Sequence, residues 1–183
     1  PLWSRGLGDV YKRQGYHHSS TVAFLADKLV YITIAIGALW FVNYTYQHTR
    51  PFSLGRFIWK GIKDGLFLLV GPVFVATAIS EFISKLYVRQ RPFVSVKGVQ
   101  LLTPHAADGG MPSHHTVFMI AIAYAIYMLN RNMGMFLMTL TVICGFARVI
   151  AGIHFPTDII AGLIIGIAAT SITTRGLAPL RRR

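Results

Sequence analysis

Residues 65–87 read GLFLLVGPVFVATAISEFISKLY, and this stretch indicates the fold class of the chain most clearly. A helix that crosses a lipid bilayer needs about 20 mostly apolar residues, with a range of roughly 17 to 25. Four other segments have a similar composition, and residues 16–27 form a weaker one that fits an interfacial helix or part of a further span. The sequence therefore predicts five to six membrane helices, five of them near residues 28–44, 65–87, 115–129, 133–153 and 158–174.

The overall composition also indicates a membrane protein. The 183 residues are 54% hydrophobic and only 13% charged, whereas a soluble domain carries about 25% charged residues. Residues 1–14, PLWSRGLGDVYKRQ, share no apolar pattern with the rest of the chain and lack the apolar core of a signal peptide, so we interpret them as a non-native leader. We expect residues 15–183 to form a single membrane-embedded domain, an all-α polytopic helix bundle.

The net charge of the chain is strongly positive. Lys and Arg number 18 against 6 Asp and Glu, which gives a formal net charge of +12. The basic residues lie between apolar blocks and at the chain end, where cations typically contact anionic lipids. We therefore expect membrane lipids as partners and no nucleic acid. The single cysteine, Cys144, allows no disulfide within the chain.

The basic residues of the short loops predict the orientation of the chain, since cytoplasmic loops carry an excess of Lys and Arg. Alternating spans place three basic segments on one side, which we assign to the cytoplasm. The long loop of residues 85–114 then faces outward. That loop is also basic, which opposes the assignment unless some of its cations bind a ligand. The cytoplasmic set comprises Arg50, Arg56, Lys60, Lys63, Arg131, Arg175, Arg181, Arg182 and Arg183.

Four short motifs concentrate the residues that carry chemistry. The alternating topology brings all four to the outward ends of the helices. Charged residues inside membrane spans are costly and usually functional. Ser113 and Pro156 suit the starts of two helices, whose free backbone N–H groups bind anions, and neighbouring cations strengthen such a site. The motifs are residues 85–92 (KLYVRQRP), residues 111–115 (MPSHH), Arg148 and residues 154–158 (HFPTD).

Two histidines and one carboxylate in these motifs indicate a nucleophilic mechanism. His154 and Asp158 are four residues apart and share a face if a helix begins near His154. The carboxylate then takes a proton from one ring nitrogen and leaves the other as a nucleophile. His115, on a different helix, is placed to protonate the leaving oxygen. No Cys/His cluster has the spacing of metal ligands, so we expect neither a metal nor another cofactor.

These motifs resemble the signature of the type 2 phosphatidic acid phosphatase superfamily. That signature is a Lys…Arg-Pro stretch, then Pro-Ser-Gly-His, then Ser-Arg, five residues, His, three residues and Asp. The chain matches it in order over about residues 80–160. The resemblance implies that His154 forms a phosphohistidine, that Asp158 orients it and that His115 is the general acid. It implies that the phosphate is bound by Lys85, Arg91, Ser113, His114 (through its backbone) and Arg148.

Three positions depart from this pattern. Lys85 is one residue closer to Arg91 than in the commonest form, so Arg89 is an alternative for the role of Lys85. His114 replaces the usual Gly, and its Cβ limits the approach of the backbone to a phosphate. Ala147 replaces the usual Ser, which removes a hydroxyl contact worth on the order of 1 to 3 kcal/mol. We expect a slower enzyme with the same mechanism; an inactive relative or a phosphotransferase is the alternative.

Three further polar residues lie near the motifs. Glu81 precedes Lys85 by four residues, and we expect the two to pair on one helix face; the alternative is that Glu81 tunes Lys85 or lies near the second phosphate of a substrate. His105 and Asp108 lie in the loop before the second motif. We expect these two either to contact the head group of a substrate or to cap the loop.

Within the superfamily, the chain looks like the bacterial undecaprenyl-diphosphate phosphatases of the bacitracin-resistance type. This resemblance rests on the short Lys-to-Arg spacing, on RPF at residues 91–93 and on HAAD at residues 105–108. It implies hydrolysis of undecaprenyl diphosphate to undecaprenyl phosphate, at the outer, periplasmic face of the bacterial inner (cytoplasmic) membrane. The alternatives are a phosphatase of glycerolipids, either phosphatidate or phosphatidylglycerol phosphate, and a membrane protein that binds or transports anions.

Overall fold

The computed structural model describes residues 19–49 and 53–175. The leader expected at residues 1–14 lies outside these ranges. All regular structure in the described ranges is helical. The elements are α2 (Ser19–Asp27), α3 (Leu29–Gln47), α4 (Leu54–Gly65), the π-helical turn η2 (Leu66–Val70), α5 (Gly71–Leu86), α6 (Pro92–Ser95), α7 (His114–Leu129), α8 (Arg131–Ile150) and α9 (Pro156–Thr174).

Four of these helical segments are long and apolar enough to cross a membrane, and α7 is a shorter apolar helix of 16 residues. This confirms the predicted all-α bundle of membrane helices. The second segment is longer than predicted, because α4, η2 and α5 run on as one 33-residue helix, Leu54–Leu86. Residues 54–64, which we expected in a basic loop, are therefore helical. Leu54, Ile58 and Ile62 recur at helical spacing among the basic residues, which is the pattern of an amphipathic helix.

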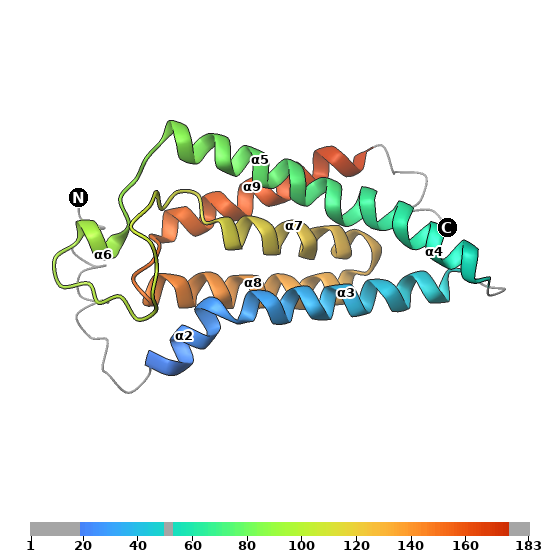
Figure 1. Cartoon of the computed structure of the whole chain (residues 1–183), viewed down its shortest axis with the longest axis horizontal. Coiled ribbons are helices and arrows are strands. Elements are labelled where there is room, and N and C mark those ends of the chain that lie inside the picture. Colours follow the sequence, from blue (N-terminus) through green and yellow to red (C-terminus); the bar gives the residue numbers. More distant parts are fainter. Residues whose placement is uncertain (1–18, 50–52, 176–183) are drawn as a thin grey trace.

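The π-helical turn inside this long segment has a local cause. Pro72 lies in the first turn of α5 and has no backbone N–H to donate. The carbonyl four residues earlier therefore loses its usual partner, and a wider turn accommodates the gap. The helix continues on both sides of η2, so the segment remains one span (Figure 1).

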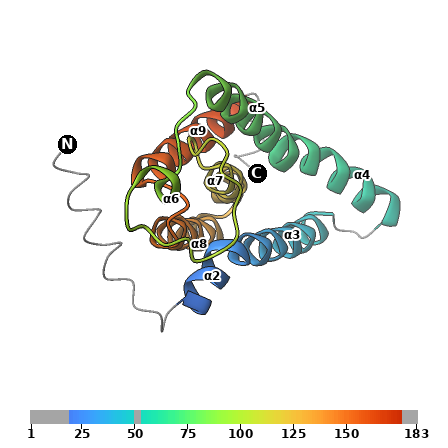
Figure 2. The same cartoon turned by 60° about the vertical axis from the view of Figure 1, so that its left-hand side comes forward.

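Helix α7 lies at the centre of the bundle, with α3, α5, α8 and α9 around it (Figure 2). At a rise of about 1.5 Å per residue, 16 residues reach about 24 Å, less than the roughly 30 Å of a hydrocarbon core. Because its neighbours surround α7, it is buried mainly against protein. Its buried side chains include Val117, Met119, Ile120 and Ile126.

Small residues allow the helices around α7 to approach closely, as in many membrane bundles. A Cβ on Gly166 of α9 would lie 2.2 Å from Cγ2 of Ile120 and 2.9 Å from the carbonyl oxygen of Val117. A Cβ on Gly134 of α8 would lie 2.1 Å from Cα of Tyr127. Both positions therefore exclude any larger side chain without movement of a helix.

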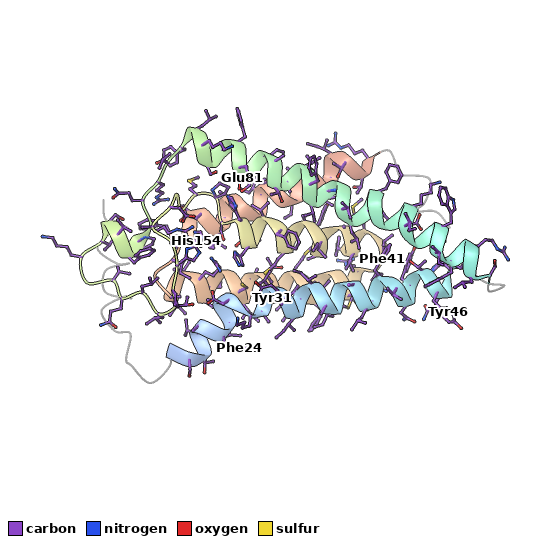
Figure 3. All side chains as sticks on the ribbon, viewed as in Figure 1. Phe24, Tyr31, Phe41, Tyr46, Glu81 and His154 are labelled. Carbon is purple, nitrogen blue, oxygen red and sulfur yellow. The ribbon has the colours of Figure 1, made fainter. Side chains whose placement is uncertain are left out.

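The bundle has two chemically different ends. His154 lies at one end and Tyr46 at the other (Figure 3). The end with His154 holds the C-termini of α5 and α8, the N-termini of α7 and α9, and the loop that contains α6 (Figure 1). All four sequence motifs meet there, as the alternating topology predicts. The position of the site at the helix ends is thus a property of the fold.

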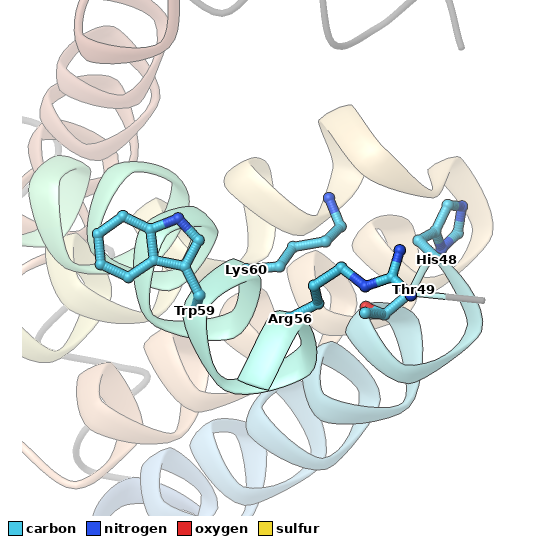
Figure 4. A pocket seen from close by; sticks show the side chains of 5 residues that line it. All are labelled: His48, Thr49, Arg56, Trp59 and Lys60. Carbon is cyan, nitrogen blue, oxygen red and sulfur yellow. The ribbon is translucent and has the colours of Figure 1, made fainter. Parts of the chain in front are cut away.

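The opposite end is basic and aromatic. A pocket of about 250 Å³ lies between the end of α3 and α4, lined by His48, Thr49, Arg56, Trp59 and Lys60 (Figure 4). Lys60 forms an ion pair of 2.8 Å with Asp64, one helical turn away. No residue of α4 is buried. Basic and aromatic side chains at one end of a membrane bundle are typical of the lipid head-group region.

Candidate active site

The site is built around His154, in the short connection between α8 and α9. Its side chain is almost fully buried, and so are those of Arg91, Arg148 and Asp158. Arg91 follows α5, whereas the other three lie within residues 148–158, and the fold brings these two distant regions of the sequence into contact. Burial of ionisable groups is costly unless they pair, so their contacts define the chemistry of the site.

Hydrogen bonds fix the tautomer of His154. Its Nδ1 lies 2.8 Å from the carbonyl oxygen of Gly110, and its Nε2 lies 3.3 Å from Nη1 of Arg91. A carbonyl only accepts a hydrogen bond and a guanidinium only donates one. The proton therefore sits on Nδ1, and the lone pair sits on Nε2, beside a cation. This is the arrangement that a nucleophilic histidine requires.

The charge state of His154 depends on its surroundings. Burial lowers the pKa of His154 from 6.5 to about 4, with Asp158 opposing the change and the cations Arg148 and Arg91 adding to it. A histidine with that pKa is neutral at pH 7. Nε2 is thus unprotonated over the physiological pH range, and its lone pair accepts the hydrogen bond of Arg91.

Asp158 lies beside His154 but does not accept its shortest hydrogen bond. The distance from Oδ2 of Asp158 to Nδ1 of His154 is 3.6 Å. Oδ2 accepts the backbone N–H of Phe155 at 2.8 Å, and Oδ1 accepts Nη1 of Arg89 at 3.0 Å. The hydrogen bond that we predicted from His154 to Asp158 goes to Gly110 instead. The orienting role of Asp158 therefore stays a prediction. At 3.6 Å its contact with His154 is electrostatic rather than a short hydrogen bond.

Arg89 is held by the start of α9. Besides Asp158, its Nη1 donates to the hydroxyl of Thr157 at 2.6 Å, and its guanidinium lies 4.0 Å from the centroid of the Phe155 ring. Lys85, the other residue proposed for the first phosphate contact, is exposed in the last turn of α5. The structure thus brings Arg89 to the site and leaves Lys85 at its edge.

Every nitrogen of the Arg91 guanidinium has a partner. Nε lies 2.8 Å from Oδ1 of Asp108, and Nη2 lies 2.8 Å from the same atom and 3.3 Å from the carbonyl oxygen of Gly109. Nη1 donates to the carbonyl oxygen of Ile153 at 3.2 Å and faces His154. Arg91 is therefore rigidly placed next to Nε2 of His154.

Arg148, 1% exposed, extends from α8 toward α2. Its Nη1 donates to the carbonyl oxygen of Ala26 at 2.9 Å, and its Nη2 lies 3.2 Å from Nε2 of His105. Its Nε is buried without a hydrogen-bond partner among the described residues. An unsatisfied donor on a buried cation, in the same cluster as His154, suits an anion.

The second motif surrounds the start of α7. Ser113 occupies the N-cap position, as predicted, but its side chain caps no backbone N–H. Its hydroxyl accepts a hydrogen bond of 3.1 Å from Thr116, and its N–H donates to the carbonyl oxygen of Asp158 at 3.1 Å. That backbone bond joins the starts of α7 and α9. His115 lies in the first turn, close enough to Arg148 and His154 for electrostatic interaction.

His114 and Glu81 form a contact that the sequence does not predict. Nδ1 of His114 lies 3.3 Å from Oε1 of Glu81, and both side chains are about half exposed. We expected Glu81 to pair with Lys85, four residues later on the same helix, and the structure pairs it across to α7 instead. The His114 side chain thus contacts α5, and its backbone opens α7.

Two further parts of the site carried no clear sequence signal. The Gly110 carbonyl is a backbone group, and α2, which supplies the Ala26 carbonyl, is only a weak apolar segment. The glycine itself was a partial clue. A Cβ on Gly110 would lie 3.3 Å from Cγ of Arg91 and 3.5 Å from the carbonyl oxygen of Arg89, so the loop must pass closely over the first motif.

Comparison with known proteins supports the motif analysis. The profile of the PAP2 superfamily matches residues 65–182. Undecaprenyl-diphosphatase BcrC of Bacillus subtilis (strain 168) is 38% identical over 89 residues, which are 49% of this chain and 46% of the relative. Bacitracin transport permease protein BcrC of Bacillus licheniformis is 28% identical over 148 residues, 80% of this chain and 65% of the relative. The chain thus spans about half to two thirds of the length of these relatives.

A solved structure has a similar fold. The crystal structure of Aquifex aeolicus LpxE superposes with a TM-score of 0.64 over 93% of both chains, at 18% sequence identity. At this identity the likeness concerns the fold alone. The profile match covers more than half of the chain and includes all four motifs at the His154 end of the bundle. The chain belongs to the PAP2 superfamily.

Proposed function

We propose that this chain is an integral membrane phosphatase that hydrolyses undecaprenyl diphosphate to undecaprenyl phosphate and inorganic phosphate, through a phosphohistidine on His154. One observation carries the proposal: the neutral Nε2 of His154 faces Nη1 of Arg91 at 3.3 Å. A nucleophile with a fixed guanidinium beside it suits attack on a phosphoryl group, whose oxygens the cation stabilises.

The reaction would proceed in two steps. Nε2 of His154 attacks the terminal phosphorus, the bond from that phosphorus to the bridging oxygen breaks, and His115, which enters the step in its protonated form, gives this oxygen a proton. Water then attacks the phosphohistidine and passes a proton to His115, which releases inorganic phosphate and restores both rings. Arg91 and Arg148 balance the charge of the phosphoryl oxygens throughout. No step calls on a metal ion.

Three observations support a lipid diphosphate as the substrate. The site lies at the ends of apolar helices, where the head group of a membrane lipid would reach His154. A B. subtilis relative bears the name undecaprenyl-diphosphatase. The HAAD stretch, on which the subfamily resemblance rests, contacts the site directly through His105 and Asp108.

Transport of an anion is the second function to weigh, because the B. licheniformis relative bears the name of a transport permease. A transport path needs polar groups across the whole bundle. In the described part of the chain, four His, Asp or Arg side chains are buried, and all lie at one end of the bundle: Arg91, Arg148, His154 and Asp158. This distribution favours a site at the membrane surface.

We also propose that the His154 end faces outward, to the periplasm or exterior, and that the chain resides in the bacterial inner membrane. The described cations of the predicted cytoplasmic set all lie toward the other end, on α4, at the α7–α8 turn and after α9 (Figure 1). Cytoplasmic ends of membrane bundles carry such an excess. The long outward loop is also basic, but two of its cations, Arg89 and Arg91, belong to the site. They therefore do not count against this orientation.

The experiment that tests the function measures phosphate release by detergent-purified protein in EDTA. Undecaprenyl diphosphate, phosphatidate and phosphatidylglycerol phosphate are compared, each with a His154→Ala control. We expect release chiefly from the diphosphate, none from the variant, and an acid-labile, base-stable phosphoenzyme after rapid quenching in base. Preference for a glycerolipid would replace the substrate and keep the mechanism, whereas full activity of His154→Ala would refute the phosphohistidine.

A further inference from the structure

The loop of residues 103–110, between α6 and α7, contacts three buried residues of the site. His105 contacts Arg148, Asp108 and Gly109 contact Arg91, and the carbonyl of Gly110 accepts a hydrogen bond from His154. We call this segment the positioning loop. The positioning loop contains none of the three residues to which a catalytic role is proposed above. Among the described contacts, it is nevertheless the one segment that contacts Arg91, Arg148 and His154.

We propose that the positioning loop assembles the anion site, with His105 holding Arg148 and Asp108 holding Arg91 in the orientation that receives a phosphate. The proposal rests on the proposed function, because it takes Arg91 and Arg148 as the phosphate ligands. His105 and Asp108 are thus positioning residues, and the guanidinium groups contact the substrate.

The contact of His105 with Arg148 defines its protonation state. Arg148 can only donate, so Nε2 of His105 must carry a lone pair and its proton must sit on Nδ1, which lies 3.3 Å from the carbonyl oxygen of Ala106. Burial, assisted by the charge of Arg91, lowers the pKa of His105 from 6.5, which keeps the ring neutral at pH 7. The ionisable groups that face His105 are Arg91, Arg148, Asp108, His115 and His154.

Protonation of His105 would break this arrangement. A proton on Nε2 would place an N–H group against Nη2 of Arg148 at 3.2 Å and remove the acceptor. Two cations at that separation repel each other. Arg148 would then lose one of its two hydrogen bonds, and its remaining bond to the Ala26 carbonyl points away from the positioning loop. Acid should therefore weaken the anion site through His105.

Asp108 acts on Arg91 in a different way. One carboxylate oxygen accepts from both Nε and Nη2 at 2.8 Å, which fixes the plane of the guanidinium. The Asp108 side chain is 63% exposed, while that of Arg91 is 6% exposed. Burial opposes ionisation of Asp108, but the hydrogen bond and charge of Arg91 together outweigh it and hold the pKa of Asp108 below its usual value. The carboxylate thus stays charged, and Arg91 stays oriented, at neutral and mildly acidic pH.

The positioning loop has its own support on α2. The hydroxyl of Thr103 hydrogen-bonds Asp27, the last residue of α2, and the N–H of Leu102 donates to the carbonyl oxygen of Ala151 at 3.2 Å. Asp27 also lies 3.9 Å from Nη1 of Arg148. Helix α2 therefore supports the positioning loop and Arg148 at the same time, while its Ala26 packs against Ala147 and Ala151.

The test measures the affinity for inorganic phosphate, by its stabilisation of the full-length protein against thermal unfolding, together with kcat and KM for the lipid diphosphate. The variants are His105→Ala, His105→Gln, Asp108→Ala and Asp108→Asn. His48→Ala and Asp64→Asn, at the opposite end of the bundle, are the matched controls. We expect the two alanine variants to lose about tenfold or more in phosphate affinity and in kcat/KM, mainly through KM, because each releases a charged hydrogen-bonding group. The controls should match the wild type.

The pH dependence separates positioning from direct binding. Glutamine at position 105 can accept from Arg148 without titrating, so the ratio of wild-type to His105→Gln phosphate affinity should fall in acid, as the pH falls through the lowered pKa of His105. The titration of phosphate itself cancels in that ratio. A ratio that rises in acid would mean that protonated His105 binds the phosphate directly, and the positioning role would be wrong.

Each remaining outcome is also decisive. Tighter phosphate binding by folded Asp108→Ala would show that the carboxylate only competes for Arg91, and wild-type binding by His105→Ala would remove His105 from the site. If the wild type binds phosphate but hydrolyses none of the lipids, the proposed function fails. Weaker binding by the variants would in that case still support the positioning loop.

Discussion

The Nδ1 atom of His154 lies 2.8 Å from the carbonyl oxygen of Gly110. A backbone carbonyl holds the tautomer of the proposed nucleophile, so replacement of a neighbouring side chain such as Asp158 does not remove the acceptor of that hydrogen bond. Asp158, the residue that the sequence suggests for this purpose, is 3.6 Å away and has two closer partners. This division of roles leads to different expectations for the two residues.

Asp158→Asn should lower kcat by about one to two orders of magnitude, roughly 1.4 to 2.7 kcal/mol of barrier. The amide removes the negative charge that stabilises His154 as its bond to phosphorus forms, while Gly110 still orients the ring. His154→Ala should lose all turnover above background. Steady-state phosphate release with equal amounts of folded protein makes the comparison. Equal loss in both variants would mean that Asp158, and not Gly110, sets the tautomer.

Arg89 should act on stability through Asp158. The pair lies 3.0 Å apart, with Arg89 17% and Asp158 0% exposed. We expect a double-mutant cycle of Arg89→Ala and Asp158→Asn to give a coupling energy of about 1 to 3 kcal/mol, since removal of one partner leaves the other charge uncompensated. Unfolding in detergent measures it. Additive effects would show that Arg89 does not depend on Asp158 and is available to a substrate.

The stability of the protein should fall in acid, in part because of His154. The pKa of His154 is about 4 in the folded protein against 6.5 for the free group. Between these values the unfolded chain binds a proton that the folded chain does not, so this contribution is complete above pH 6.5 and is lost as the pH falls toward 4. It amounts to roughly 3 kcal/mol. As the pH is lowered from 7 to 4, the unfolding midpoint should fall less steeply for His154→Asn than for the wild type. Parallel curves for the two proteins would contradict the lowered pKa of His154.

Close packing of α9 on α7 should make Gly166 intolerant of substitution. A methyl group at Gly166 would meet Ile120 and the Val117 carbonyl at less than 3 Å, whereas a Cβ on Gly55 of α4 would meet nothing within 4 Å. We expect Gly166→Ala to destabilise the protein by about 1 to 3 kcal/mol. Gly55→Ala is the matched control and should be neutral or stabilising by up to about 1 kcal/mol. The free energy of unfolding in detergent is measured for both variants. Similar effects of the two substitutions would mean that α7 and α9 lie further apart than in this structure.

The orientation of the bundle can be tested with single cysteines. Val94 on α6 and Trp59 on α4 are exposed at opposite ends, and the native Cys144 is buried, so Cys144→Ala supplies the background. We expect a membrane-impermeant maleimide to label Val94→Cys in intact cells and Trp59→Cys only after lysis. The reverse pattern would place the site on the cytoplasmic side.

Much of the fold is determined by local sequence. Apolar runs of about 20 residues require helices in a bilayer, because no water is present there to satisfy the backbone. The alternation of spans places residues 85–92, 111–115, 148 and 154–158 at one end, and the structure has them there. We did not predict the continuation of α5 back to Leu54, because the many polar and basic residues of α4 interrupt the apolar run that marks a membrane span.

Sequence was thus sufficient to locate the membrane helices, to choose the end of the bundle that holds the motifs, and to name His154, Arg91 and Arg148 as candidates for its chemistry. The contacts between these groups emerged from the three-dimensional packing. The acceptor for His154 is a backbone carbonyl, and Glu81 pairs with His114 on α7 rather than with Lys85 on its own helix. Backbone atoms have no sequence signature, and contacts between helices depend on their relative rotation and separation. Periodicity along one chain segment does not specify either quantity.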